Sequence, residues 1–243
     1  MDPSGNLKTQ EEMTEVVTGM PAMLLLTLAS YLLGVFFQKK SGISMLHPFI
    51  TAMVVIIGVL LIFKVPYSDY RAGNKLLDFL LGPCVVALAL RLYDNLEIVK
   101  KNMAAILSAV VVGSIVGIVG VWGVARLMGA DSLFIKSMEA KSVTVPIALE
   151  ITDIIGGSSS LIAISVVFTG VLGAVLGPAV LKMLRITDPV AKGVAMGCSA
   201  HGIGTGRAIE LGAVEGAVSG LCIVLMGVAT SVLVPVLNSL LGL

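Results

Sequence analysis

The chain has 243 residues, of which 57% are hydrophobic and only 13% are charged. A soluble domain carries about 25% charged residues, so this composition cannot cover a water-exposed surface. The formal net charge is +1, and Lys and Arg residues never form a run longer than a pair, which excludes an electrostatic site for nucleic acid. The composition therefore predicts a membrane protein whose main partner is the lipid bilayer.

Residues 1–15 are polar, with Glu11, Glu12 and Glu15 in place of the basic start of a secretory signal. We expect residues 1–15 to be a short polar tail that stays on the protein, followed by a single transmembrane domain over residues 16–243.

Five runs in this domain are apolar and close to the length of about 20 residues that crosses a hydrocarbon core. They cover residues 16–37, 46–63, 103–125, 161–181 and 216–243. Lipid offers the backbone no hydrogen-bond partners, and the alternating polarity of a barrel strand is absent, so these runs should be helices. The predicted fold is an all-α integral membrane protein, a multi-span helical bundle with discontinuous helices.

Three further segments, 76–90, 142–155 and 189–212, are short, rich in glycine or interrupted by proline and charge. Gly82 and Pro83 in the first of them predict either a kinked span or two partial helices. Lys and Arg residues are spread almost evenly over successive loops, so they do not fix the orientation in the membrane.

A weak internal similarity places Gly129, Asp131 and the run to Ser142 over Thr187, Asp188 and the run to Ser199. It covers a handful of residues, which leaves open both a structural repeat of the kind common in transporters and a chance likeness.

Glycines at helical spacing mark two faces for close helix packing. One face carries Gly170, Gly173 and Gly177. The other carries Gly113, Gly117, Gly120 and Gly123, and from it we expect a homodimer, although the same face could pack inside the protomer.

Two segments concentrate polar side chains at membrane depth, where such groups are costly and usually functional. They read KSVTVPIA from Lys141 and GCSAHGIGTGR from Gly197. Irregular backbone is tolerated at this depth only where it is buried or lines a cavity, so we expect the two segments to face each other near mid-membrane and to form one anion site.

The candidate substrate-binding residues are Lys141, Ser142, Thr144, Pro146, Ser199, His201, Gly204, Thr205 and Arg207. Candidates for proton coupling are His201, Glu150 and Asp153.

Each candidate also has a structural interpretation. Lys141 could extend its side chain from a helix end, and Arg207 could pair with Glu210 one turn on. His201 could be a packing residue, and the hydroxyls could bond to carbonyls of their own helices. With two histidines and no paired cysteines, the sequence favours no metal, no cofactor and no enzymatic activity.

At these segments the chain resembles the LrgB/CidB family. The resemblance rests on Gly82 and Pro83 followed by VALA and Leu92-Tyr93, on the KSVT and PIA runs, and on His201 with Gly204, Thr205 and Arg207. The chain departs from the family at Arg91 and Ala140, where proline is usual, and at Ala200, where serine is usual.

The family includes antiholin-like and holin-like regulators of bacteria and the plastid glycolate/glycerate translocator. The resemblance implies a multi-pass protein of the bacterial cytoplasmic membrane that carries small carboxylates such as pyruvate, lactate, glycolate or glycerate, and it leaves proton coupling open. The alternative it implies is control of murein hydrolase activity and lysis together with a small LrgA/CidA-type membrane partner. A purely structural membrane subunit is the third class.

Overall fold

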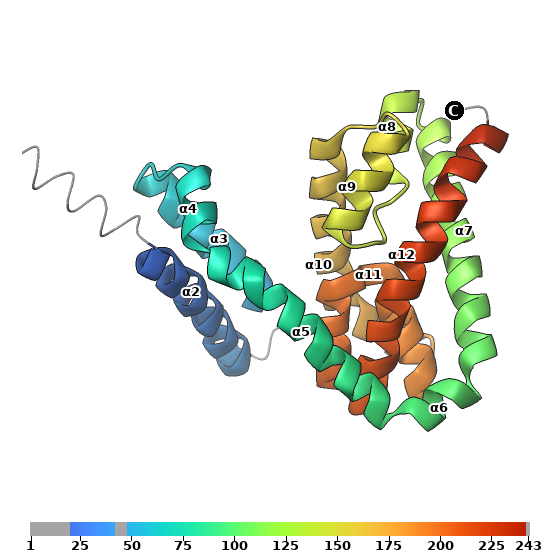
Figure 1. Ribbon diagram of the computed structural model, residues 1–243, viewed down its shortest axis with the longest axis horizontal. Coiled ribbons are helices and arrows are strands. Elements are labelled where there is room, and N and C mark those ends of the chain that lie inside the picture. The colour runs from blue at the N-terminus through green and yellow to red at the C-terminus, as the bar shows by residue number, and fades with distance from the viewer. Residues whose placement is uncertain (1–19, 42–47, 242–243) are drawn as a thin grey trace, which may run out of the picture. The chain divides into compact units, whose positions relative to one another are not determined.

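The computed structural model describes residues 20–41 and 48–241, and every regular element in these ranges is a helix (Figure 1). Four of the described helices are long and apolar enough to cross a membrane, and a fifth apolar helix is shorter. The predicted all-α membrane fold is confirmed. The predicted polar tail, residues 1–15, lies outside the described residues.

The helices follow one another in the order that Figure 1 labels. They are α2 (Met20–Ser41), α3 (Pro48–Ile62), α4 (Tyr67–Gly73), α5 (Lys75–Asp94), α6 (Leu96–Lys101), α7 (Met103–Leu127), α8 (Ser132–Met138), α9 (Val145–Ile154), α10 (Ser159–Met183), α11 (Pro189–Leu211) and α12 (Ala213–Leu241).

The chain divides into two compact units, and the boundary lies inside α5, after Val86. In the first unit α2 packs along α3, and a polar cluster joins α2 to α4. Thr27 Oγ1 lies 2.9 Å from Tyr70 Oη and donates to Asn74 Oδ1 at 3.0 Å. Helix α5 is one helix with Pro83 inside it, so the alternative of two partial helices is wrong. A single domain over residues 16–243 stays a prediction.

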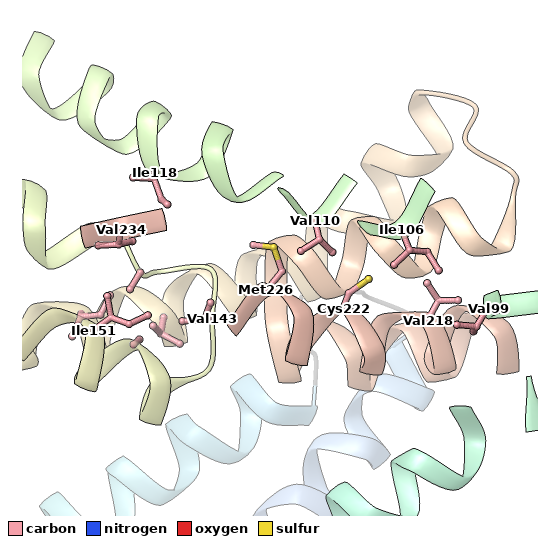
Figure 2. Packing of buried hydrophobic residues seen from close by; sticks show 14 residues of the cluster. Val99, Ile106, Val110, Ile118, Val143, Ile151, Val218, Cys222, Met226 and Val234 are labelled. Carbon is pink, nitrogen blue, oxygen red and sulfur yellow. The ribbon is translucent and has the colours of Figure 1, made fainter. Parts of the chain in front are cut away.

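The second unit is built on three long helices, α7, α10 and α12. Figure 2 shows that α7 and α12 run in the same direction, because their buried side chains follow the same order. These are Ile106, Val110 and Ile118 on α7, and Cys222, Met226 and Val234 on α12. Helix α10 runs the opposite way, as its contacts with α11 also show below.

Helix α11 is a helical hairpin that reverses at His201, whose backbone angles are φ 40° and ψ −132°. Both arms pack on the same stretch of α12. A Cβ on Gly197 of the first arm would lie 2.5 Å from the Ser219 carbonyl oxygen, and Thr205 of the second arm hydrogen-bonds to the Ser219 hydroxyl. The predicted discontinuous helix is therefore present as a complete reversal at one residue.

Helices α8 and α9 form a second hairpin, between α7 and α10. After α9 the chain returns to α8, because Ser158 N–H donates at 2.7 Å to Ser137 Oγ near the end of that helix. The six residues 139–144 join the two short helices. We call residues 139–144 the first tip and His201 the second tip.

The two hairpins belong to two copies of one unit that run in opposite directions. Helices α7 and α10 each have 25 residues, and each ends in a left-handed residue, Gly129 with φ 75° and Arg185 with φ 57°. The same hydrogen bond closes both ends: Ala130 N–H donates to Ala125 O at 2.9 Å, and Ile186 N–H donates to Leu181 O at 2.9 Å.

Each hairpin then begins with an aspartate cap. Asp131 Oδ1 accepts from Phe134 N–H, and Asp188 Oδ1 accepts from Ala191 N–H, both at 2.8 Å. The repeat that the sequence left open is present in the structure, with Asp131 matching Asp188 as expected. Gly129 matches Arg185 instead of Thr187.

Close packing rather than burial from water holds the second unit together, since lipid is as apolar as the core. Gly170, Gly173 and Gly177 of α10 face the first arm of α11. A Cβ on Gly170 would lie 2.7 Å from the His201 ring, and a Cβ on Gly177 would lie 2.6 Å from Met196 Sδ. The order of these contacts shows that α10 is antiparallel to that arm. The predicted role of these glycines is confirmed.

Candidate functional site

Ser142 of the first tip and His201 of the second tip lie level with the middle of the long helices. A Cβ on Gly117, the fifteenth of the 25 residues of α7, would lie 3.9 Å from Ser142 Oγ of the first tip. Gly170, which approaches His201 of the second tip, is the twelfth of the 25 residues of α10. The hairpins enter from opposite ends of the unit and stop near its centre, which is the arrangement that the sequence predicted for a site.

The first tip is non-helical because its residues disfavour a continuous helix. Thr144 is extended, with φ −68° and ψ 149°, and serves as the cap residue of α9 without a side-chain cap bond. Pro146 lies in the first turn of α9, where its missing N–H has no helical partner to lose. A proline disfavours a helical conformation of the residue before it, yet α9 begins at Val145.

The second tip is closed. His201 is buried, and its Nε2 lies 2.9 Å from the Val166 carbonyl oxygen of α10. A non-glycine residue with positive φ costs about 1–3 kcal/mol, so the surrounding contacts must hold it. Gly202, Gly204 and Gly206 would allow an unwound backbone, but residues 202–211 are helical and the break falls on His201. Gly204 instead allows the two arms of α11 to pack closely, since a Cβ on Gly204 would lie 2.7 Å from Met196 O.

A cavity of about 830 Å³ joins the first tip to α10 and the first arm of α11. Lys141 and Ser199, one from each predicted segment, line it together with Ser165 and Thr169 of α10. Its other walls are apolar and include Phe168, which is 63% exposed, so the cavity opens to the side.

Lys141 is the charged group of this cavity. Its ammonium is half-buried and, among the described residues, hydrogen-bonds to the adjacent Ser142 Oγ at 3.4 Å with no carboxylate within ion-pair distance. Ser199 Oγ donates to Ala195 O at 2.6 Å, as expected for a hydroxyl on its own helix, and keeps its acceptor capacity.

Other predicted site residues lie away from this cavity. Pro146 and Glu150 line a separate cavity of about 380 Å³ with Ser231 and Pro235 of α12. Asp153 is exposed on α9 and accepts a hydrogen bond from Ser159 Oγ at 2.6 Å. The roles of Glu150 and Asp153 in proton coupling stay predictions.

The second arm of α11 has its polar groups paired. Thr205 Oγ1 and Ser219 Oγ are 2.7 Å apart and buried. Arg207 Nη1 donates to Glu210 Oε2, and both side chains reach the surface. Arg207 therefore has the structural partner that the sequence offered as the alternative, and its binding of a substrate carboxylate stays a prediction.

Sequence reasoning missed three polar residues that the structure places near the first tip. Ser165 and Thr169 lie one turn apart on α10, a spacing that could have marked one polar stripe on an apolar span. Glu139 lies in a polar stretch of the sequence, residues 126–141, which is typical of an exposed connection, but it is 2% exposed. No local pattern predicts that burial.

The sequence matches the LrgB-like family over residues 27–240. The chain belongs to the LrgB-like family. It is 34% identical over 220 residues to the antiholin-like protein LrgB of Bacillus mycoides (strain KBAB4), which covers 90% of this chain and 96% of the relative. The antiholin-like proteins LrgB of Bacillus cereus (strain B4264) and Bacillus anthracis (strain CDC 684 / NRRL 3495) match to the same extent. No solved structure matches this LrgB-like chain.

Proposed function

We propose that this LrgB-like protein is a secondary carrier of small carboxylates, such as pyruvate, lactate, glycolate or glycerate, in a bacterial cytoplasmic membrane. The observation that carries the proposal is Lys141, a cation that has no carboxylate partner among the described residues and lines a cavity that runs along α10 from Ser165 to Leu181. A charge at this depth is costly without a ligand or water, so an anion is the complementary occupant.

The walls of the cavity support a small monocarboxylate. Lys141 offers one point charge, while Ser199 and Thr169 offer hydroxyls for a keto or hydroxyl oxygen beside the carboxylate. Leu172 and Leu176 provide apolar wall. A larger dianion would leave its second charge without a partner.

The broken helices also support transport. In many carriers, half-helices meet near the bilayer midplane and their amino ends bind anionic groups. Here the amino end of α9 lies at the first tip, and its cap residue Thr144 makes no side-chain cap bond. A site between two opposed hairpins also gives each face of the membrane a way to reach it.

Uptake of labelled pyruvate, lactate and glycolate into proteoliposomes tests this function. Lys141→Met should strongly lower saturable uptake, and Lys101→Met, at the exposed end of α6, is the matched control. Equal uptake by wild-type protein, both variants and empty liposomes would reject a carrier of these substrates.

The names of the relatives favour a role in the control of lysis more directly than they favour transport. They are antiholin-like proteins, so we propose as the alternative that the chain regulates murein hydrolase activity and lysis with a small LrgA/CidA-type partner. The two functions are compatible if lysis control is a consequence of carboxylate movement.

Lysis of a deletion strain complemented with Lys141→Met separates these functions. If regulation depends on transport, the variant should fail to restore normal lysis although it reaches the membrane. Full restoration by a variant that carries no substrate would make regulation independent of the cavity, and co-purification would then test the partner.

The homodimer stays a proposal that rests on α7. A Cβ on Gly113, Gly120 or Gly123 would meet no described atom of another element within 4 Å, whereas one on Gly117 would lie 3.9 Å from Ser142 Oγ, so the described residues cover this face only at Gly117. Cysteine crosslinking along α7 in native membranes should give a dimer, and only monomer at every position would count against it.

A further inference from the structure

Glu139 is a buried carboxyl group without a hydrogen-bond partner. The residue is 2% exposed, and neither side-chain oxygen has a partner among the described residues. The flanking Ala140 and the nearby tip residue Val143 are also buried and apolar. A carboxyl group in such a place is stable only if it is protonated, paired with a cation or hydrogen-bonded by strong donors. Neither oxygen accepts a hydrogen bond from the described residues.

Asn238 of α12 is the polar group beside this carboxyl. It is 5% exposed, and neither its amide oxygen nor its amide nitrogen has a hydrogen-bond partner among the described residues. A protonated Glu139 could donate its O–H to the amide oxygen while the amide N–H₂ donates to the Glu139 carbonyl oxygen. An ionised Glu139 could use only the donor half of that amide.

Few other charges act on Glu139. On its own helix, Lys136 is close enough to act on the carboxyl electrostatically. The ionisable residues of the neighbouring helices are Arg126 at the end of α7, Glu150 and Asp153 on the exposed side of α9, Lys182 at the far end of α10, and Glu215 at the far end of α12. The face of α12 that meets Glu139 offers Asn238, which is neutral.

Glu139 and Lys141 occupy two sides of the same tip. Lys141 lines the open cavity, whereas Glu139 is enclosed beside α12. Two residues of chain separate their Cα atoms by at most about 7 Å. If an anion at Lys141 raises the affinity of Glu139 for a proton, then by linkage a proton on Glu139 favours the anion by the same factor.

We propose that Glu139 is the proton-carrying residue of the transport site, held by Asn238 and coupled to the anion at Lys141. One proton bound as one monocarboxylate binds would make the loaded carrier neutral relative to the empty one. This inference rests on the proposed carrier function and names a residue outside the predicted coupling set of His201, Glu150 and Asp153.

The test compares two transport modes of the same proteoliposomes. Glu139→Gln keeps the shape of the side chain but cannot release a proton, so it should lose pyruvate accumulation driven by a pH gradient while keeping exchange of labelled for unlabelled pyruvate. Glu97→Gln, at an exposed carboxylate of α6, should keep both modes.

A binding experiment on the wild-type protein tests the coupling without relying on the folding of Glu139→Gln. In weakly buffered detergent solution, wild-type protein should take up protons when pyruvate binds, and Asn238→Leu should shift the pH at which this uptake is half-maximal.

The outcomes separate the two proposals. A wild-type protein that neither accumulates nor exchanges carboxylates would remove the carrier function and this inference with it. A wild-type protein that exchanges pyruvate would keep the carrier function, and this inference alone would be overturned if Glu139→Gln still accumulated it with the gradient. Accumulation driven by sodium, or loss of coupling in Glu150→Gln with Glu139→Gln unaffected, would also overturn it.

Discussion

The two helical hairpins of the second unit share a plan but differ at their tips. The tip between α8 and α9 is six residues of non-helical chain that carry Glu139 and Lys141 without ion-pair partners. The tip of α11 is one strained residue, His201, bonded to the Val166 carbonyl. The difference leads us to propose that the first hairpin carries the ligand chemistry, while the second is a rigid wall against which the ligand is held.

The largest expected effect follows from removing the unpaired charge of the first tip. Lys141→Met should lower pyruvate uptake at subsaturating concentration by about 10- to 100-fold, the loss of one charge-assisted bond. Initial rates at matched protein level measure it. A rate within twofold of wild type would move the anion site away from this hairpin.

The close packing of the second hairpin gives the next effect. Gly197→Ala would put a Cβ 2.5 Å from the Ser219 carbonyl and 2.8 Å from Cys222 Cβ, and should destabilise the fold by about 1–3 kcal/mol. Gly206→Ala on the second arm meets no atom within 4 Å and is the matched control. Thermal unfolding in detergent should separate the two. Equal melting temperatures would contradict the tight packing.

A smaller effect tests the buried hydroxyl pair that holds the second arm to α12. Thr205→Val leaves the Ser219 hydroxyl without its partner and should cost about 1–3 kcal/mol of stability, whereas Thr205→Ser keeps the bond. If the pair is only structural, the apparent KM of the folded Thr205→Val protein stays unchanged. A raised KM would instead assign Thr205 to substrate binding.

The smallest effect is expected at Arg207. Because its guanidinium pairs with Glu210 and does not line the cavity with Lys141, Arg207→Lys and Glu210→Gln should each leave uptake within about twofold of wild type. A strong loss in Arg207→Lys with little effect of Glu210→Gln would restore the predicted carboxylate-binding fork and weaken the contrast between the hairpins.

Much of the architecture could be predicted from the sequence because lipid imposes length and composition on every span. Residues 103–125 and 161–181 fall within α7 and α10, and the glycines of α10 pack as their spacing indicates. The interrupted segments could also be predicted, because Pro146 and the glycines after His201 are apparent in the sequence.

What the sequence could not predict is the direction of each side chain at a break. Lys141 and Ser199 share a cavity, but Pro146 from the same motif lines another, since neighbouring residues at a tip point to different helices. Glu139 and Asn238 are 99 positions apart and come together only through the packing of the first hairpin on α12. Such pairings depend on tertiary contacts that no local pattern contains.

The matching caps after α7 and α10 bear on how this chain came to exist. The same helix end, aspartate cap and hairpin occur twice in opposite directions, so one supersecondary unit is stable in both membrane orientations. If the chain arose by duplication of a single unit, that unit would have had to insert either way round and pair with an inverted copy of itself. The even spread of Lys and Arg over the loops is what such dual insertion requires, because a strong bias would have selected one orientation.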